Sequence, residues 1–263
     1  MPITCPIQFP RLSQSEMAKL DYEVMSHAFA AHQQLGCLCD ESVYHHSMEE
    51  RLREAGFSVE SELPVTLTFR NFITRLSLDL VVNCRAIYDF KTVSALTPAN
   101  FTQLLNYLFV TNAARGKLIN FRPASVESQF VNSALDDTQR RRFDTDTQDW
   151  RGPDEFRKMV EELLADWGTG LDQSLYTQAL VHCLGGEESV TRQLPMQLGG
   201  VPLGNQRFHL VNDETAFHIT TLQDDLGAHH PLQLRKLMVP SPLKALLWIN
   251  IARHQLTLST IAE

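Results

Sequence analysis

The 263-residue chain has few of the features that mark secreted, membrane-spanning or repetitive proteins. Its five cysteines are an odd number without CxxC spacing, which argues against a disulfide framework and favours the reducing cytoplasm. No apolar run approaches the roughly 18–20 residues that cross a bilayer, and the N-terminus lacks the cationic and apolar parts of a secretory signal. Glycine and proline, 12 of each, show no period, which excludes a collagen-like chain. We therefore expect a globular cytoplasmic protein without a membrane partner.

Basic residues are also scarce, because 23 Lys and Arg face 31 Asp and Glu. The acidic excess is uneven: residues 1–134 contain 11 basic and 13 acidic residues, whereas residues 135–263 contain 12 and 18. Tight nonspecific binding to duplex nucleic acid usually needs a basic surface, because phosphate neutralisation supplies much of the affinity. The bulk charge argues against that class of protein and leaves room only for a local basic face.

Landmarks that recur at a nearly constant offset indicate an internal repeat. The segments LGCLCDESVY and WGTGLDQSLY each follow an amphipathic stretch, and they end at Tyr44 and Tyr176, 132 residues apart. Later matches keep offsets of 131 and 130; they are Glu62-Leu63-Pro64 with Gln193-Leu194-Pro195, Gln103-Leu104 with Gln233-Leu234, and Ile119-Asn120 with Ile249-Asn250. We therefore expect two related domains, residues 1–134 and 153–263. A polar linker is expected at 135–152, with the run Arg140–Arg142 in solvent.

The apolar period of the first copy predicts an α/β layered unit. Helices are expected over residues 14–35, 41–56 and 98–110, the last opened by Pro98 at a favoured first-turn position. Runs rich in β-branched and apolar residues predict strands, at 63–72, 76–82, 86–90 and 116–121. The expected order is helix, helix, three strands, helix, strand.

Three charged residues interrupt the apolar strands of this copy, Asp79 in LSLDLVV and Asp89 with Lys91 in IYDFKTV. Side chains two apart on a strand share a face, so Asp89 and Lys91 point the same way. Two carboxylates suit Mg²⁺, which keeps waters that can act as nucleophiles, and the lysine could orient or deprotonate such a water or counter a phosphate charge. Taken alone, the pattern also fits a simpler interpretation, in which Asp79 pairs with Lys91 and Asp89 ends a strand.

Further polar residues occur in a fixed order around this motif. Glu41 opens a helix upstream, and Gln103 and Tyr107 lie four apart on the following helix, hence on one face. This ordered set resembles the PD-(D/E)XK nuclease superfamily, in particular its RecB-like branch. Over roughly residues 20–130, the segments LGCLCDESVYHHSMEERLREAGFSVESELPV, LDLVV, DFK, QLLNYL and GKLINF resemble the GxxExxY family of that superfamily.

The resemblance implies a restriction-endonuclease-like fold, with a mixed central sheet flanked by helices. It implies a site for Mg²⁺ or Mn²⁺ built from Glu41, Asp79 and Asp89, and catalysis of phosphodiester hydrolysis in DNA or RNA. The implied catalytic residues are those three together with Lys91, Gln103 and Tyr107, the last two as supporting residues beside the phosphate or the metal. Two departures are visible: Leu38 stands where the family has glycine, and Asp89 replaces the usual glutamate, a change the superfamily motif allows.

The second copy has lost the carboxylates of this motif. Gln173 replaces Glu41, and either Phe208 or His209 lies opposite Asp79. The remaining replacements are His218 for Asp89, Thr220 for Lys91 and Leu237 for Tyr107, while Gln233 matches Gln103. The second copy is therefore expected to be degenerate. A zinc site made from its histidines (His209, His218, His229 and His230) is disfavoured because adjacent surface histidines are more often solvated, and no iron–sulfur cluster is expected.

The sequence thus predicts tandem PD-(D/E)XK domains that pack as a pseudo-dimer within a monomer, or that form a homodimer. The predicted function is metal-dependent hydrolysis of nucleic acid in the first domain only. The alternative is a nucleic-acid-associated or protein-interaction module that keeps the fold without cutting. The net charge of −8 and Leu38 favour the alternative, and the intact Asp79, Asp89 and Lys91 favour the enzyme.

Overall fold

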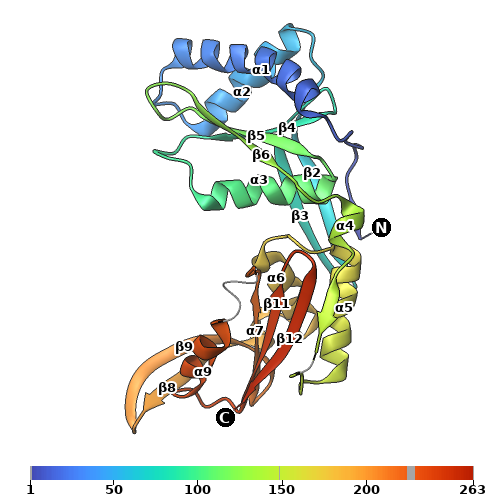
Figure 1. Ribbon diagram of the computed structural model, residues 1–263. Helices are drawn as coiled ribbons and strands as arrows, with labels where there is room; N and C mark the ends of the chain where they lie inside the picture. The colour runs from blue at the N-terminus through green and yellow to red at the C-terminus, as the bar shows by residue number, and fades with distance from the viewer. Residues whose placement is uncertain (1, 148, 224–228, 263) are drawn as a thin grey trace. The chain divides into compact units, whose positions relative to one another are not determined.

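The computed structural model describes residues 2–147, 149–223 and 229–262. The chain forms two compact units (Figure 1). The first unit comprises Met1–Thr68 and Ile73–Asp137, and the second comprises Phe69–Phe72 and Thr138–Glu263. In the described part of the chain, no helix is long and apolar enough to span a membrane.

The first unit contains a mixed sheet with the strand order β1-β2-β3-β4-β5-β6. The strands are β1 (Ile3–Thr4), β2 (Val59–Phe69), β3 (Phe72–Val82), β4 (Ala86–Lys91), β5 (Arg115–Asn120) and β6 (Glu127–Asn132). The helices are α1 (Gln14–Leu35), α2 (Glu41–Glu54) and α3 (Pro98–Thr111). Strands β4 and β5 are parallel, while β3 and β6 pair antiparallel to them on either side. Helices α1 and α2 cover one face of the sheet and α3 covers the other (Figure 1).

Local sequence explains where these helices begin and end. Ser13 and Glu16 form a capping box at the start of α1, which satisfies backbone N–H groups that have no partner within the helix. Thr97 and Asn100 form the corresponding box at the start of α3, with Pro98 in its first turn. Asn112 ends α3 in the left-handed conformation, with φ 55°. The apolar faces of α1 and α2 then bury against β4 and β5 in one core.

The second unit contains another mixed sheet, with the strand order β7-β12-β11-β10-β9-β8. Its strands are β7 (Asp144–Asp146), β8 (Thr191–Leu198), β9 (Val201–Asn212), β10 (Thr215–Thr220), β11 (Ala245–Ile251) and β12 (Gln255–Ala262). The helices of this part of the chain are α4 (Asp137–Arg140), α5 (Asp154–Trp167), α6 (Gln173–Cys183), α7 (Glu187–Val190) and α9 (His230–Met238). As in the first unit, the strand before the last helix pairs parallel with the strand after it, here β10 with β11.

The two units also share side-chain hydrogen bonds at corresponding places. The Tyr44 hydroxyl donates to the Gly36 carbonyl at 2.5 Å, and the Tyr176 hydroxyl donates to the Gly168 carbonyl at 2.6 Å. In both cases the tyrosine lies in the second helix and its partner lies eight residues earlier, directly after the first helix. This bond fixes the connection between the two helices in each unit.

A buried asparagine repeats in the same way at the end of the parallel strand pair. The Asn120 amide donates to the Val93 carbonyl at 2.8 Å, and its carbonyl accepts from the Val93 N–H at 3.1 Å. Asn250 makes the same two bonds to Leu222, at 3.0 and 2.9 Å. Each asparagine side chain therefore makes the two hydrogen bonds that the backbone of a neighbouring strand would make, at the point where the chain leaves the sheet.

The predicted elements of the first unit are present, with β1 and β6 as additional edge strands. The segment 135–152, expected as a polar linker, contains α4 and β7 instead of only irregular chain. Strand β7 pairs parallel with β12, with Asp144 opposite Gln255. Its three polar residues show no apolar period, so only the distant partner strand gives this segment a regular structure.

The expectation that Arg140 lies in solvent is wrong. Arg140 is 1% exposed, and its guanidinium donates to the carbonyls of Trp167 and Thr169, each at 2.7 Å. Trp167 is the last residue of α5, where helix carbonyls have no partners within the helix. Arg140 thus caps α5, because a buried guanidinium needs several acceptors and the helix end supplies them.

We expect Arg140→Ala to lower the free energy of unfolding by about 1–3 kcal/mol, because it leaves buried carbonyls without a donor. The matched control is Arg142→Ala, since Arg142 belongs to the same basic run but is exposed. Urea denaturation followed by tryptophan fluorescence measures both variants. Equal stability of the two variants would contradict the capping role of Arg140.

Candidate active site

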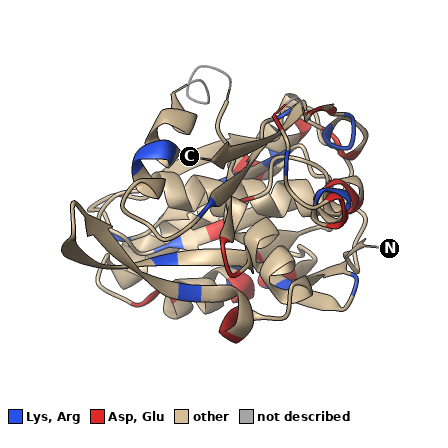
Figure 2. Ribbon diagram, turned by 90° about the horizontal axis from the view of Figure 1, so that it is seen from below, with Lys and Arg blue, Asp and Glu red and all other residues tan. Residues whose placement is uncertain are grey.

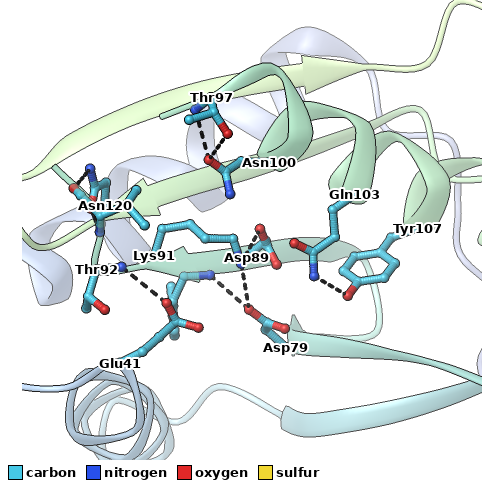
Figure 3. Close-up of polar contacts among 12 residues, drawn as sticks. Glu41, Asp79, Asp89, Lys91, Thr92, Thr97, Asn100, Gln103, Tyr107 and Asn120 are labelled. Carbon is cyan, nitrogen blue, oxygen red and sulfur yellow. Dashed lines mark hydrogen bonds and ion pairs between the residues drawn. The ribbon is translucent and has the colours of Figure 1, made fainter. Parts of the chain in front are cut away.

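The six predicted site residues come together around the end of β4 in the first unit (Figure 3). They come from four elements: Glu41 from α2, Asp79 from β3, Asp89 and Lys91 from β4, and Gln103 and Tyr107 from α3. The face of β4 that carries Asp89 and Lys91 is the face that α3 covers, as shown by the orientation of the side chains in Figure 3.

Asp79 marks the point where β3 separates from β4. The antiparallel register runs from Val82 opposite Ala86 to Leu80 opposite Tyr88. One step further, the Phe90 N–H donates to the Asp79 carboxylate at 3.1 Å. The Asp79 side chain therefore accepts a hydrogen bond from the β4 backbone in place of a backbone carbonyl of β3, and this bond fixes the orientation of the carboxylate.

The Lys91 ammonium lies between two carboxylates. Its Nζ atom is 3.0 Å from Oδ2 of Asp89 and 3.8 Å from Oδ2 of Asp79. The ion pair of the simpler interpretation thus exists, but it belongs to a larger group of charges. Burial by itself lowers the pKa of Lys91, whereas the carboxylates of Asp89, Asp79 and Glu41 raise it, and the net shift is upward. Lys91 is therefore protonated at neutral pH.

Asp89 is the most constrained member of the group, since its side chain is fully buried. Among the described residues neither of its oxygens accepts a well-formed hydrogen bond, although Oδ2 makes the ion pair with Lys91. Burial, followed by the charge of Asp79, raises the pKa of Asp89 to about 8, against the opposing effect of Lys91. The buried carboxyl group of Asp89 therefore favours its protonated form when no cation lies beside it.

Glu41 lies at the start of α2 beside these residues. Its Oε2 atom accepts from the Thr92 N–H at 3.1 Å, just after the end of β4. Burial raises the pKa of Glu41, and the charge of Asp79 adds to this rise while Lys91 opposes it. Glu41 is thus close enough to Asp79 and Lys91 for their charges to shift its pKa.

His45 also lies at the site, although it is not among the residues predicted from the sequence. Its Nε2 atom is 2.7 Å from the Asp79 carbonyl oxygen, and its ring packs edge-on against Phe90 with centroids 5.6 Å apart. A signal was present in the sequence, because His45 follows Glu41 by four residues and so shares its helix face.

Gln103 and Tyr107 form the wall of the site on α3. The Gln103 amide donates to the Tyr107 hydroxyl oxygen at 2.8 Å. Burial raises the pKa of Tyr107 to about 12; the bond from Gln103 opposes this, and the charges of Asp79 and Asp89 add to it. The hydroxyl is therefore neutral at physiological pH and accepts from Gln103 while keeping its own proton to donate.

The donor set fits a hard divalent cation, although the ligands are not arranged as a ready-made site. Nowhere in the described part of the chain do three Asp, Glu, His or Cys side chains converge as a metal-binding group. Asp79 and Asp89 nevertheless supply the one or two carboxylates that Mg²⁺ usually takes from a protein. The two buried oxygens of Asp89 lack well-formed hydrogen bonds, and a cation beside them would favour the ionised carboxylate against the effect of burial.

The corresponding place in the second unit has no such carboxylates. The register of β9 with β10 sets His209 opposite Phe217. When β9 and β10 are aligned with β3 and β4, the pair His209 and Phe217 falls on Leu80 and Tyr88. In that alignment Phe208 falls on Asp79. His218 takes the place of Asp89 on β10.

Lys and Arg are interspersed with Asp and Glu along the ribbon (Figure 2). This distribution agrees with the modest bulk charge of the chain. Any attraction for phosphate therefore depends on local groups such as Lys91.

Comparison with known proteins supports a nuclease fold for the first unit. Residues 18–132 match the family model described as PD-(D/E)XK nuclease superfamily. No curated protein matches the chain. Among solved structures, the one titled "Crystal structure of SSO0001" is 18% identical, with a TM-score of 0.30. That match covers 47% of this chain and 63% of the length of the other.

The raised pKa of Asp89 predicts how stability depends on pH. The ordinary pKa of aspartate, about 3.9, describes the unfolded chain, whereas the folded value is about 8. The folded protein therefore holds this proton more tightly, and the contribution of Asp89 to stability falls as pH rises from about 4 to about 8. Asp89→Asn should remove this loss and raise the free energy of unfolding at pH 8 by roughly 1–3 kcal/mol, with little change near pH 4.

Urea titrations at several pH values, without divalent metal, measure this effect. Asp40→Asn is the matched control, because Asp40 is exposed and its side chain makes no capping bond to α2. A variant at position 89 with the same pH slope as the wild type would show that Asp89 is ionised in the fold.

Proposed function

We propose that the first unit is a metal-dependent nuclease domain that hydrolyses phosphodiester bonds of DNA or RNA. The observation that carries this proposal is the group of Asp79, Asp89 and Lys91 at the end of β4. The superfamily match over residues 18–132 supports the same activity. We further propose, from the motifs in the sequence, that the domain belongs to the RecB-like branch and to the GxxExxY family.

In this proposal Asp79 and Asp89 hold Mg²⁺ or Mn²⁺, and Glu41 lies beside them as a further carboxylate. A bound cation would activate a water molecule and neutralise charge on the phosphate. Holding the two carboxylates at the place where β3 and β4 separate keeps them fixed, because Asp79 is bonded to the Phe90 N–H and His45 contacts its carbonyl.

Lys91 acts in this proposal as a cation and hydrogen-bond donor. Its raised pKa favours the ammonium form, so it orients the attacking water or pairs with a phosphate oxygen, in preference to removing a proton. Tyr107 donates its proton to a substrate oxygen, and Gln103 orients the Tyr107 hydroxyl. These residues are catalytic in the sense that each lies where the phosphate would bind.

We also propose that the two units arose by duplication and that the second is a degenerate copy. The support is the shared order of elements, together with the repeated tyrosine bonds and asparagine bonds. The active site would then be confined to the first unit, because Gln173, Phe208 and His218 replace its carboxylates.

The alternative is a module that keeps the fold and binds without cutting. Two observations favour it. The described residues contain no ready-made group of metal ligands. In addition, Lys91 already pairs with the Asp89 carboxylate. Leu38, at the family's glycine position, is also 83% exposed. Measurements of cleavage and of metal binding separate the enzyme from the binding module.

Cleavage of nucleic acid tests the proposal directly. With Mg²⁺ or Mn²⁺, the protein should degrade or nick some member of a panel of single- and double-stranded DNA and RNA. Lys91→Met should reduce the rate at least ~100-fold, because it removes the cation that stabilises the developing charge. The control Lys19→Met, an exposed residue of α1, should keep full activity. Identical rates for wild type and Lys91→Met would favour the binding module.

Thermal unfolding tests the metal site independently of any substrate. Mn²⁺ at a hundredfold excess over its dissociation constant should stabilise the fold by about 2.7 kcal/mol, if it binds only the folded state. Asp79→Asn should lose this response, whereas the exposed control Asp40→Asn should retain it. If Asp79→Asn still responds like the wild type, the cation binds elsewhere and the assigned ligands are wrong.

A further inference from the structure

A cavity of about 530 Å³ lies within the second unit, at the place that aligns with the candidate active site of the first unit under the proposed duplication. Gln173, which opens α6 as Glu41 opens α2, lines this cavity, and so does His218 on β10. The volume lies within the roughly 300–1,000 Å³ typical of small-molecule sites. The residues that line this cavity offer a different chemistry from the carboxylates of the first unit.

The groups that line the cavity carry no net charge at neutral pH. Among the described residues of its lining, Arg207 and Glu187 alone have a permanent charge, and they form an ion pair with each other. Burial lowers the pKa of His209 and of His218. The Arg207 guanidinium lowers the pKa of His209 further, and Glu187 opposes it. Both imidazoles are therefore neutral. Neither an anion such as phosphate nor a metal cation finds an opposite charge there, and no group of metal ligands occurs in the part of the chain that the structure describes.

The same lining is rich in neutral hydrogen-bonding groups and in rings. Three amide side chains face the cavity, those of Gln173, Gln178 and Gln206. The rings of His209 and Phe217 stack beside them, with centroids 5.6 Å apart and an interplanar angle of 30°. Side-chain amides pair with the edges of bases, and aromatic or imidazole rings stack on their faces. Together these groups suit a flat, uncharged molecule with donors and acceptors along its edge.

We propose that this cavity binds a nucleobase, either in a nucleoside or in an unstacked position of a single strand. The neutral imidazoles and amides pair with the edge of the base, and the rings and apolar side chains receive its face. The phosphate and sugar stay outside the cavity, so binding requires no unpaired basic side chain in the cavity lining. This activity goes beyond the proposed nuclease function, because no part of it depends on cleavage in the first unit.

Calorimetric titration of the full chain at pH 7.5 without divalent metal tests the proposal, with adenosine, guanosine, cytidine and uridine as probes. At least one nucleoside should bind, and inorganic phosphate should not. Gln173→Ala should weaken that binding about five- to tenfold or more, since one good contact to a base is worth ~1–3 kcal/mol. His218→Ala should do the same. Gln173 is exposed in the first turn of α6, so its variant does not disturb the core.

Two control variants show whether the nucleoside binds in this cavity or at another place on the chain. Gln233→Ala, on the exposed surface of α9 and outside the cavity lining, should bind as the wild type does. Lys91→Met should also keep the affinity, which shows that binding does not depend on the proposed nuclease site. The proposal is overturned if no nucleoside binds below ~1 mM, if phosphate competes for the site, or if both cavity variants, Gln173→Ala and His218→Ala, keep full affinity.

Discussion

The burial of Asp89 beside Asp79 and Lys91 is the constraint on which the proposed chemistry depends. Asp89 is fully buried beside Asp79, and one ammonium serves both carboxylates. Burial of carboxylates without full neutralisation costs free energy, which is visible in the raised pKa of Asp89. Keeping this group lowers the stability of the metal-free fold, and a bound cation would restore that stability. This is the physical reason to assign a functional role to these residues, since a purely structural ion pair would have needed only one carboxylate.

Under the proposed duplication, comparison of the two units separates the residues that serve the fold from those of the candidate site. Tyr176 and Asn250 keep the bonds of their counterparts in the first unit, so these residues hold helices and strands together in both units. His218 and Phe208, in contrast, stand where the first unit has carboxylates. The sheet and its helices are thus compatible with either set of side chains. In both proposals, function depends on the few residues at the end of the central strands, which are charged in the first unit and neutral in the second.

Much of the first unit could be predicted from sequence, because local patterns determine it. The shared face of Asp89 and Lys91 follows from the period of a strand, and the helix that begins at Glu41 follows from its apolar spacing and its stop at Gly56. What could not be predicted depends on distant partners. Strand β7 is regular only because β12 pairs with it, and Arg140 is buried only because α5 ends against it. The raised pKa of Asp89 likewise depends on burial by segments far apart in the chain, which no local pattern records.

Anomalous diffraction from crystals soaked in Mn²⁺ tests the central claim most directly, because it locates the cation without assuming any substrate. The account predicts a single strong peak per chain, with carboxylate oxygens of Asp79 and Asp89 at roughly 2.0–2.3 Å from the ion. Glu41 should lie next to this peak, and Lys91 should have moved away from at least one carboxylate. A crystal with no peak at these residues, or with its only peak among the histidines of the second unit, would contradict the account.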